Sequence, residues 1–478
     1  MGKPFYVLAI DQGTTGTRAA LYGRDGRLAA SSYREFTQFF PRPGWVEHDA
    51  AEIWDCTQAV MKRALAGRDA RRVAAIGITN QRETVVLWDR KTGRPVRRAI
   101  VWQDRRGAEL CSRLRRKGVE PRVRRKTGLV LDPYFSASKL HWLFHEDPAL
   151  LARARRGEVL FGTIDSWLLW NLTGGRVHAT DLTNASRTLL FDIRRERWDE
   201  ELLRLFGVPA AALPRVLPSG GRFGATAAGV PITAVMGDQQ AALYGQGCYG
   251  PGQVKNTYGT GCFVVANTGK AWKAPPQGLL ATLACDARGA KTYALEGSIF
   301  AAGAAVQWLR DGLGLFSDAG ESERLAKSVP DSGGVTLIPA FAGLGSPHWR
   351  PDVRGNITGL TRGTTRAHLA RATLEAVAHQ TADVVEAMGG VRALKADGGV
   401  TANAFLMQLQ ADLLGFPVTV SARRESTAWG AAALAGRAAG VWKDMAEAPG
   451  KTYRPRMPRA AARALRVAWK RQVAALLG

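Results

Sequence analysis

The sequence predicts an α/β protein built from two related halves. Near its start, a short apolar run at residues 5–10 leads into a polar segment rich in glycine and threonine at residues 11–18. A similar arrangement recurs at residues 254–262, about half the chain away. Strand-like runs and helical periodicity are mixed throughout the rest of the chain. We therefore expect two α/β units, 1–246 and 247–478, divided where glycines cluster before Pro251.

The first unit is predicted to open with a β-hairpin. Residues 5–10 are apolar throughout, as in a buried strand. Residues 19–22 and 28–30 are also apolar, and the Asp25-Gly26 pair between them is typical of a tight hairpin turn. The segment 11–18 is therefore predicted to join two antiparallel strands rather than a strand and a helix.

Later elements are predicted from the spacing of their apolar residues. Residues 74–79, 84–88 and 232–236 are predicted strands, and the first two of these are joined by residues 80–83. Helices are predicted at residues 239–244, 366–387, 404–414 and 459–477.

Composition excludes several classes of protein. With 46% hydrophobic and 22% charged residues, the chain is neither disordered nor collagen-like. No apolar run reaches the roughly 18 residues of a membrane span, and the start lacks the pattern of a signal peptide. The five cysteines lack metal-ligand spacing. We expect a reduced, cytoplasmic protein with no transmembrane segment.

The net charge of +25 has three interpretations. It fits a nucleic-acid or membrane surface, an anionic substrate such as a nucleotide, or a compositional bias spread over solvated faces. We favour the bias, because net charge governs solubility rather than fold, and we expect no specific nucleic-acid partner.

Residues 11–18 have what a phosphate-binding loop needs. Glycines let backbone N–H groups approach an anion, and threonine hydroxyls add donors. Asp11 is suited to hold Mg²⁺ through water, and Arg18 to clamp a transferring phosphoryl group. A plain hairpin turn would explain this segment alone, but its recurrence at residues 259–261 favours a clamp on phosphates from both halves.

Other polar clusters follow predicted strands. Residues 80–83 place the opposite charges of Arg82 and Glu83 side by side between two predicted strands, which suits the recognition of a small polyol. Asp238 follows the strand 232–236 at the end where ligands of α/β sheets bind. Asp238 could act either as the general base that takes a proton from a substrate hydroxyl or as the N-cap of the next helix, and the sequence does not decide between these roles. The segment 397–403 suits either backbone contact with a nucleotide or a plain turn.

Several long motifs together resemble the FGGY carbohydrate kinase family, from about residue 5 to about residue 445. They are DQGTT at 11–15, GWVEHD at 44–49, GITNQRET at 77–84, YFSASK at 134–139, GDQQAA at 237–242, NTYGTGC at 256–262, GNITGL at 355–360 and DGG at 397–399.

The resemblance implies an actin-like ATPase architecture, in which two ribonuclease H-like domains enclose an interdomain cleft for ATP and substrate. It implies transfer of the ATP γ-phosphate to the 3-hydroxyl of glycerol, giving sn-glycerol 3-phosphate in the first step of glycerol catabolism, with Mg²⁺ as cofactor. Residues 1–246 would carry the glycerol site and the first phosphate loop, and residues 247–478 the nucleotide site and the second loop.

The resemblance also implies roles for individual residues. Asp238 is the expected general base and Asp11 the expected metal ligand. The expected glycerol-binding residues are Arg82, Glu83, Trp102, Tyr134, Asp238, Gln239 and Phe263. The expected nucleotide-binding residues are Thr14, Thr15, Gly16, Arg18, Thr260, Gly303, Gln307, Gly399 and Asn403.

Two features depart from the family pattern. Gly16 stands where serine is common, so one side-chain contact to phosphate is lost while the backbone donor stays. The segment 223–231 is shorter than the glycine-rich loop with which regulated bacterial members bind a sugar bisphosphate. In addition, no histidine lies between Pro218 and Pro231, where some relatives are phosphorylated. We therefore expect neither inhibition by fructose bisphosphate nor a histidine-phosphorylation switch.

Two alternative functions stay open. One is a kinase for another polyol or sugar, such as erythritol or xylulose, although residues 80–83 and 237–240 favour glycerol. The other is a basic nucleic-acid or membrane-binding protein that kept the fold without activity, against which the intact Asp11, Arg18 and Asp238 argue. Because relatives form dimers and tetramers, we expect a homo-oligomer of one of these sizes.

Overall fold

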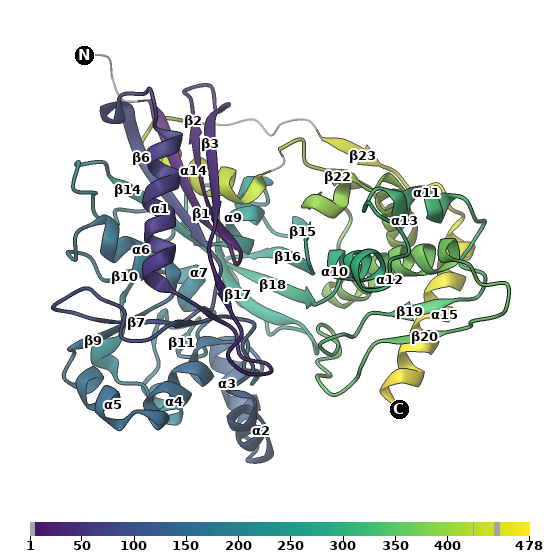
Figure 1. Cartoon of the computed structure of the whole chain (residues 1–478), viewed down its shortest axis with the longest axis horizontal. Helices are drawn as coiled ribbons and strands as arrows, with labels where there is room; N and C mark the ends of the chain where they lie inside the picture. Colours follow the sequence, from purple (N-terminus) through teal and green to yellow (C-terminus); the bar gives the residue numbers. More distant parts are fainter. Residues whose placement is uncertain (1–4, 424, 444–449) are drawn as a thin grey trace.

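The computed structural model describes residues 5–423, 425–443 and 450–478 (Figure 1). Its first main sheet has the strand order β14-β6-β1-β2-β3. Strands β1, β2 and β3 form an antiparallel meander, whereas β6 and β14 extend the sheet in parallel beyond β1. The strands are β1 (Tyr6–Gln12), β2 (Gly16–Tyr22), β3 (Leu28–Glu35), β6 (Val73–Asn80) and β14 (Ile232–Gly237).

The second main sheet repeats this arrangement in the C-terminal half. Its order is β17-β18-β16-β15-β21-β22-β23, in which β15, β16 and β18 take the places of β1, β2 and β3, and β21 and β22 those of β6 and β14. The expectation of two related α/β halves is confirmed. The strands are β15 (Val254–Tyr258), β16 (Cys262–Gly269), β17 (Leu280–Cys285), β18 (Lys291–Ile299), β21 (Leu394–Asp397), β22 (Val418–Val420) and β23 (Lys451–Tyr453).

The predicted helices are present with small changes at their ends. The fifteen α-helices of the described residues are α1 (Ala50–Ala64), α2 (Ala108–Arg116), α3 (Glu120–Thr127), α4 (Ser136–Glu146), α5 (Pro148–Arg155), α6 (Ile164–Leu172), α7 (Leu182–Ala185), α8 (Glu200–Phe206), α9 (Asp238–Gly245), α10 (Gly303–Gln307), α11 (Glu321–Lys327), α12 (Arg366–Met388), α13 (Ala404–Leu414), α14 (Ser426–Ala438) and α15 (Arg459–Leu477). Short helical turns are η1 (Ala70–Arg72), η2 (Ala210–Ala212), η3 (Trp308–Gly312) and η4 (Gly399–Ala402). In the described part of the chain, no helix is both long and apolar enough to cross a membrane.

Helix α14 crosses back from the C-terminal half onto the first sheet (Figure 1). Its sequence is rich in alanine and glycine, which allows the backbones to approach closely. A Cβ on Gly430 would lie 1.8 Å from the carbonyl oxygen of Ala241 in α9, and one on Gly77 would lie 2.2 Å from that of Ala431. The two halves of the sequence are therefore interlocked by tight packing.

The predicted strands around residues 80–83 do not pair with each other. β6 belongs to the first main sheet, whereas β7 (Val86–Asp89) pairs with β9 (Val159–Gly162) in a separate small sheet. The chain therefore turns sharply between two sheets, and this turn carries Arg82 and Glu83. Other small sheets combine β4 (Gln38–Phe39), β5 (Glu47–His48) and β8 (Ala99–Ile100); β10 (Ala179–Asp181) and β13 (Arg215–Leu217); β11 (Phe191–Asp192) and β12 (Arg197–Trp198); and β19 (Thr336–Ile338) and β20 (Asn356–Thr358).

Candidate active site

The loop between β1 and β2 has its carbonyl groups occupied and two amides available. Gly13 N donates to Gly16 O at 3.0 Å, Gln81 Nε2 donates to Gly13 O at 3.1 Å, and Gln38 Nε2 donates to Thr14 O at 3.1 Å. Among the described residues, nothing accepts a hydrogen bond from the backbone N–H of Thr14 or Thr15. A loop whose carbonyl oxygens already accept hydrogen bonds, and whose N–H groups are free, can bind an anion.

The loop between β15 and β16 repeats this pattern. Gly259 N donates to Gly261 O at 2.9 Å, while Gly303 N donates to Gly259 O and Ala302 N to Thr260 O. No acceptor in the described residues meets the amides of Thr260 and Gly261. The predicted recurrence of the loop is thus confirmed in its hydrogen bonding.

Asp11 ends up close to other acidic groups. It lies at the end of β1, and its pKa is raised to about 7 by burial first and then by the charges of Asp238 and Glu425, against the opposing effect of Arg18. Arg18 forms an ion pair of 3.2 Å with Glu425. Within the described chain, no hydrogen bond or ion pair reaches the Asp11 carboxylate, so the charge of Arg18 compensates it only in part.

Arg82 is the centre of a buried ionic network. Its Nη1 and Nη2 bond the two carboxylate oxygens of Glu296 at 2.6 and 3.1 Å, and its Nε lies 3.2 Å from Asp238 Oδ1. Arg187 joins the network, with Nε 2.6 Å from Glu83 Oε1 and Nη2 2.9 Å from Glu296 Oε1. Two buried arginines therefore face two buried glutamates, and Asp238 lies at the edge.

Burial and charge affect the two glutamates in opposite ways. Burial raises the pKa of Glu296, but Arg187 and Arg82 outweigh it and lower that pKa to about 2. For Glu83 burial prevails, and its pKa is raised. Glu83 also has a φ of 63°, which is uncommon for a residue with a side chain, and its carbonyl accepts a hydrogen bond from Ser136 Oγ at 3.0 Å.

Asp238 is the first residue of α9 but does not cap that helix. Gly237 holds the N-cap position, and Asp238 Oδ1 accepts from its neighbour's backbone, Gln239 N, at 2.7 Å. The capping alternative is therefore wrong, because the carboxylate turns towards Arg82 instead. With 31% of its side chain exposed beside fully buried partners, Asp238 is accessible to a ligand.

Aromatic rings from both halves meet beside this network. The Trp102 ring centre lies 5.5 Å from that of Tyr134 and 6.4 Å from that of Phe263 on β16. Trp102 Nε1 donates to Thr14 Oγ1 at 2.9 Å, and Arg82 Nη2 donates to the Tyr134 hydroxyl at 3.4 Å. The structure thus joins the predicted glycerol residues to the first phosphate loop.

Lys255 links the two halves through Gln239. Its buried Nζ donates to Gln239 Oε1 at 2.5 Å and to Thr257 Oγ1 at 2.9 Å. Burial is the main cause that lowers the pKa of Lys255 to about 8, and the charge of Asp397 opposes it. Gln239 Nε2 in turn lies 3.3 Å from Asp238 Oδ2.

The remaining predicted nucleotide residues surround the second loop or follow it. A Cβ on Gly303 would lie 2.6 Å from Gly259 O and 3.0 Å from the side chain of Val400, so α10, the loop and η4 are packed closely. Gly399 borders open space. Gln307 ends α10 with an exposed side chain, and Asn403 caps α13 by accepting from Leu406 N at 2.9 Å.

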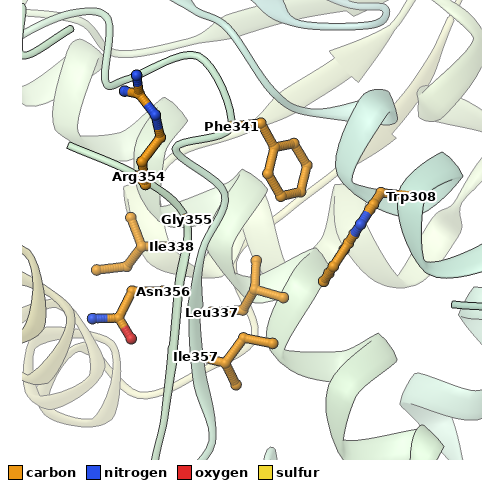
Figure 2. Close-up of a pocket in the computed structure, with 8 residues that line it drawn as sticks. All are labelled: Trp308, Leu337, Ile338, Phe341, Arg354, Gly355, Asn356 and Ile357. Atoms are coloured by element: carbon orange, nitrogen blue, oxygen red, sulfur yellow. The ribbon is translucent and has the colours of Figure 1, made fainter. Parts of the chain in front are cut away.

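A separate cavity of about 350 Å³ lies between η3 and the β19–β20 pair (Figure 2). The side chains of Trp308, Leu337, Phe341 and Ile357 gather around it. None of the predicted site residues lines it, so it is distinct from the polar site above.

The sequence pattern of the FGGY family of carbohydrate kinases matches most of the chain. Its N-terminal domain matches residues 6–245 and its C-terminal domain residues 254–439. The chain belongs to the FGGY family of carbohydrate kinases. Members of this family have an actin-like ATPase fold, and the two repeated sheets fit that architecture.

Individual FGGY kinases are similar along their whole length. A glycerol kinase of Trichlorobacter lovleyi is 55% identical over 485 aligned positions, covering 98% of both chains. The structure of Plasmodium falciparum glycerol kinase with ADP superposes with a TM-score of 0.92, at 34% identity, covering 100% of this chain and 99% of that one. A xylulose kinase from Rhodospirillum rubrum has a TM-score of 0.85 at 26% identity, with 98% and 99% coverage.

Three charged residues of this FGGY kinase site were not singled out from the sequence. They are Arg187, Lys255 and Glu296. A weak signal was available for two of them, because Lys255 follows an apolar residue and Glu296 follows Ala294 and Leu295 in predicted strand-like segments, and a buried charge needs partners. Arg187, in the loop after α7, gave no such signal.

Proposed function

We propose that this chain transfers the γ-phosphate of ATP to glycerol, giving sn-glycerol 3-phosphate and ADP in the first step of glycerol catabolism. One observation carries the proposal: Asp238, partly exposed and 3.2 Å from Arg82, lies beside a buried ionic network whose aromatic neighbours contact the first phosphate-type loop. The full-length similarity to glycerol kinases supports glycerol over other polyols.

In this proposal, glycerol lies against Trp102, Tyr134 and Phe263 with its carbon edge. Its hydroxyls bond Arg82, Glu83, Gln239 and Asp238. A site that pairs every hydroxyl rejects analogues lacking one, because its own buried polar groups would be left unpaired. The Arg187–Glu296 pair acts as a support, since it fixes the position of the Arg82 guanidinium.

The chemistry assigned to Asp238 is that of a general base. Its carboxylate accepts the proton of the glycerol 3-hydroxyl as the hydroxyl oxygen bonds to the γ-phosphorus and the bond from that phosphorus to the β-phosphate oxygen breaks. General-base assistance contributes about 10²–10⁴-fold to such a step. The rest of the acceleration comes from positioning and neutralising phosphate charge.

The nucleotide is assigned to both loops and the residues around them. The free amides of Thr14, Thr15 and Thr260, the backbone at Gly16 and the Arg18 guanidinium would hold phosphates. Gly303, Gln307, Gly399 and Asn403 would contact the rest of the nucleotide.

Asp11 fits a role in holding Mg²⁺. It is a half-buried carboxylate with neither hydrogen bond nor ion pair among the described residues, next to other acids, and a cation would satisfy it. Mg²⁺ takes one or two protein carboxylates and completes its shell with water and phosphate oxygens. When bound, it would neutralise charge on the phosphates.

Three further assignments belong to the proposal. The chain divides into domains 1–246 and 247–478, with substrate and nucleotide in a cleft between them, which the repeated strand order and the family match at 6–245 and 254–439 support. It assembles as a dimer or tetramer. It works in the cytoplasm.

The test measures ADP release from ATP and Mg²⁺ with glycerol, dihydroxyacetone, erythritol or xylulose. Turnover mainly with glycerol, and sn-glycerol 3-phosphate as product, is the expected result. A clear preference for erythritol or xylulose would assign the site to another polyol or sugar. No turnover with any of the four, together with salt-sensitive retention on DNA or anionic vesicles, would overturn the kinase assignment.

A further inference from the structure

Tyr33 fills the space that a side chain at position 16 would need. On the antiparallel β2–β3 pair, Tyr33 is directly opposite Arg18, and its side chain reaches Gly16 on the same face. A Cβ on Gly16 would lie 2.5 Å from the Tyr33 hydroxyl oxygen and 2.6 Å from Cζ. Glycine at position 16 and tyrosine at position 33 are therefore complementary.

This packing carries the Tyr33 hydroxyl to the tip of the first phosphate loop. The hydroxyl lies 3.4 Å from Thr15 Oγ1, its one hydrogen-bond neighbour among the described residues. That distance is well beyond the roughly 2.7–2.8 Å typical of a hydroxyl pair, so the donor is not committed. Tyr33 is also 43% exposed as a residue, which leaves it accessible at the loop that carries the free amides of Thr14 and Thr15.

The ring of Tyr33 also contacts the charged group of the loop. The Arg18 guanidinium carbon lies 5.3 Å from the ring centre, within the range of a cation–π contact. The other Arg18 contact in the described chain is the ion pair of 3.2 Å with Glu425. Tyr33 therefore borders the loop amides on one side and Arg18 on the other.

We propose that Tyr33 is a further nucleotide-binding residue, whose hydroxyl donates a hydrogen bond to a phosphate oxygen of ATP and so replaces the side-chain donor that Gly16 lacks. Its ring holds Arg18 towards the same phosphates. The identity of the ligand rests on the proposed function, whereas the placement of Tyr33 does not. The competing explanation is that Tyr33 only covers Gly16.

The substitution Tyr33→Phe separates the two explanations, because it removes the hydroxyl and keeps the ring. Binding of ATP with Mg²⁺ is measured by calorimetry without glycerol, next to binding of adenosine. We expect Tyr33→Phe to bind ATP about tenfold more weakly, as for the loss of one hydrogen bond to a charged group, and to bind adenosine unchanged. The matched control is Tyr453→Phe on β23, which loses a hydroxyl far from the loop and should bind both ligands as the wild type does.

A second variant guards against misfolding and tests the ring. Tyr33→Ala should weaken ATP binding more than Tyr33→Phe, because Arg18 loses its contact as well. In turnover, Tyr33→Phe should raise the KM for ATP and leave the KM for glycerol unchanged.

Two results would overturn the role of Tyr33: ATP affinity of Tyr33→Phe equal to the wild type, or equal losses for ATP and adenosine. ATP binding without phosphorylation of any polyol would instead contradict the proposed function, and the comparison of ATP affinities would still decide the role of Tyr33.

Discussion

Replacing Glu296 with glutamine removes one charge from the buried network and changes little in shape. Glu296 accepts two hydrogen bonds from Arg82, at 2.6 and 3.1 Å, and forms an ion pair with Arg187 Nη2 at 2.9 Å. After Glu296→Gln, Arg187 would keep only Glu83 as an ion-pair partner, and Arg82 would keep Glu83 and the partly exposed Asp238. Removing one partner of a buried ion pair is costly, because the charges left behind lose compensation while they stay away from water.

The magnitude follows from the pKa of Glu296. That pKa lies at about 2 in the folded protein against an ordinary value of 4.5, because Arg187 and Arg82 outweigh burial. A lowered carboxylate pKa stabilises the fold above pH 4.5, and this contribution is lost as the pH falls towards 2. The difference corresponds to about 3 kcal/mol at pH 7, close to the roughly 3–5 kcal/mol cost of breaking a buried ion pair.

The assay is thermal and urea unfolding of wild type and Glu296→Gln. A loss of about 3 kcal/mol should lower the transition temperature by about 3–6 °C, depending on whether the whole chain or half of it unfolds as one unit. The difference should persist from pH 7 down to pH 5, where Glu296 is still ionised. The control Glu158→Gln, whose partner Arg156 is also exposed, should unfold like the wild type.

Catalysis provides a second measure of the same variant. Because Glu296 fixes the guanidinium of Arg82, we expect Glu296→Gln to raise the KM for glycerol more than the KM for ATP. Wild-type stability together with a wild-type KM for glycerol would refute the argument that this network positions Arg82.

Three further predictions concern acid, a glycine and regulation. Burial is the main cause that lowers the pKa of His48 and His178 to about 4 and that of His379 to about 3, so the folded protein favours the uncharged form of these histidines. The free energy of unfolding, measured with urea, should therefore fall as the pH drops below about 6.5. An unfolding free energy that stays constant between pH 6.5 and 5 would contradict this. Gly398 has a φ of 93°, and a Cβ there would lie 2.3 Å from Tyr258 O. Gly398→Ala should therefore lower both the stability of the fold and the affinity for ATP. The control Gly415→Ala, with nothing within 4 Å of its Cβ, should lower stability alone. Because the connection into β14 is short, millimolar fructose bisphosphate should leave glycerol turnover unchanged, and clear inhibition would show that a binding site exists.

Local patterns in the sequence predicted much of the fold. The loop at residues 11–18 was expected between antiparallel strands, and it joins β1 to β2 with Asp11 opposite Arg18. Helices α13 and α15 have the predicted ends, and α12 extends one residue beyond its prediction. Such features depend on neighbouring residues, whose periodicity and turn chemistry can be read directly.

Long-range pairing was not predictable in the same way. Arg82 and Glu296 are 214 positions apart, one in the turn after β6 and the other on β18, so neither residue indicates the other. The return of α14 onto the first sheet depends on the close approach of Gly430 to Ala241, which no periodicity encodes. The sequence likewise leaves the role of Asp238 open, because the direction of its carboxylate depends on Arg82, a residue that only the fold brings near.

The central claim is that Asp238 takes the glycerol proton, and single-turnover phosphoryl transfer tests it most directly. The rate is measured with ATP, Mg²⁺ and glycerol already bound to wild type, Asp238→Asn and the control Asp55→Asn, an exposed aspartate on α1. We predict that Asp238→Asn slows transfer by about 10²–10⁴-fold while ATP affinity is retained, and that the control is unchanged. Transfer by Asp238→Asn at the wild-type rate would contradict the claim.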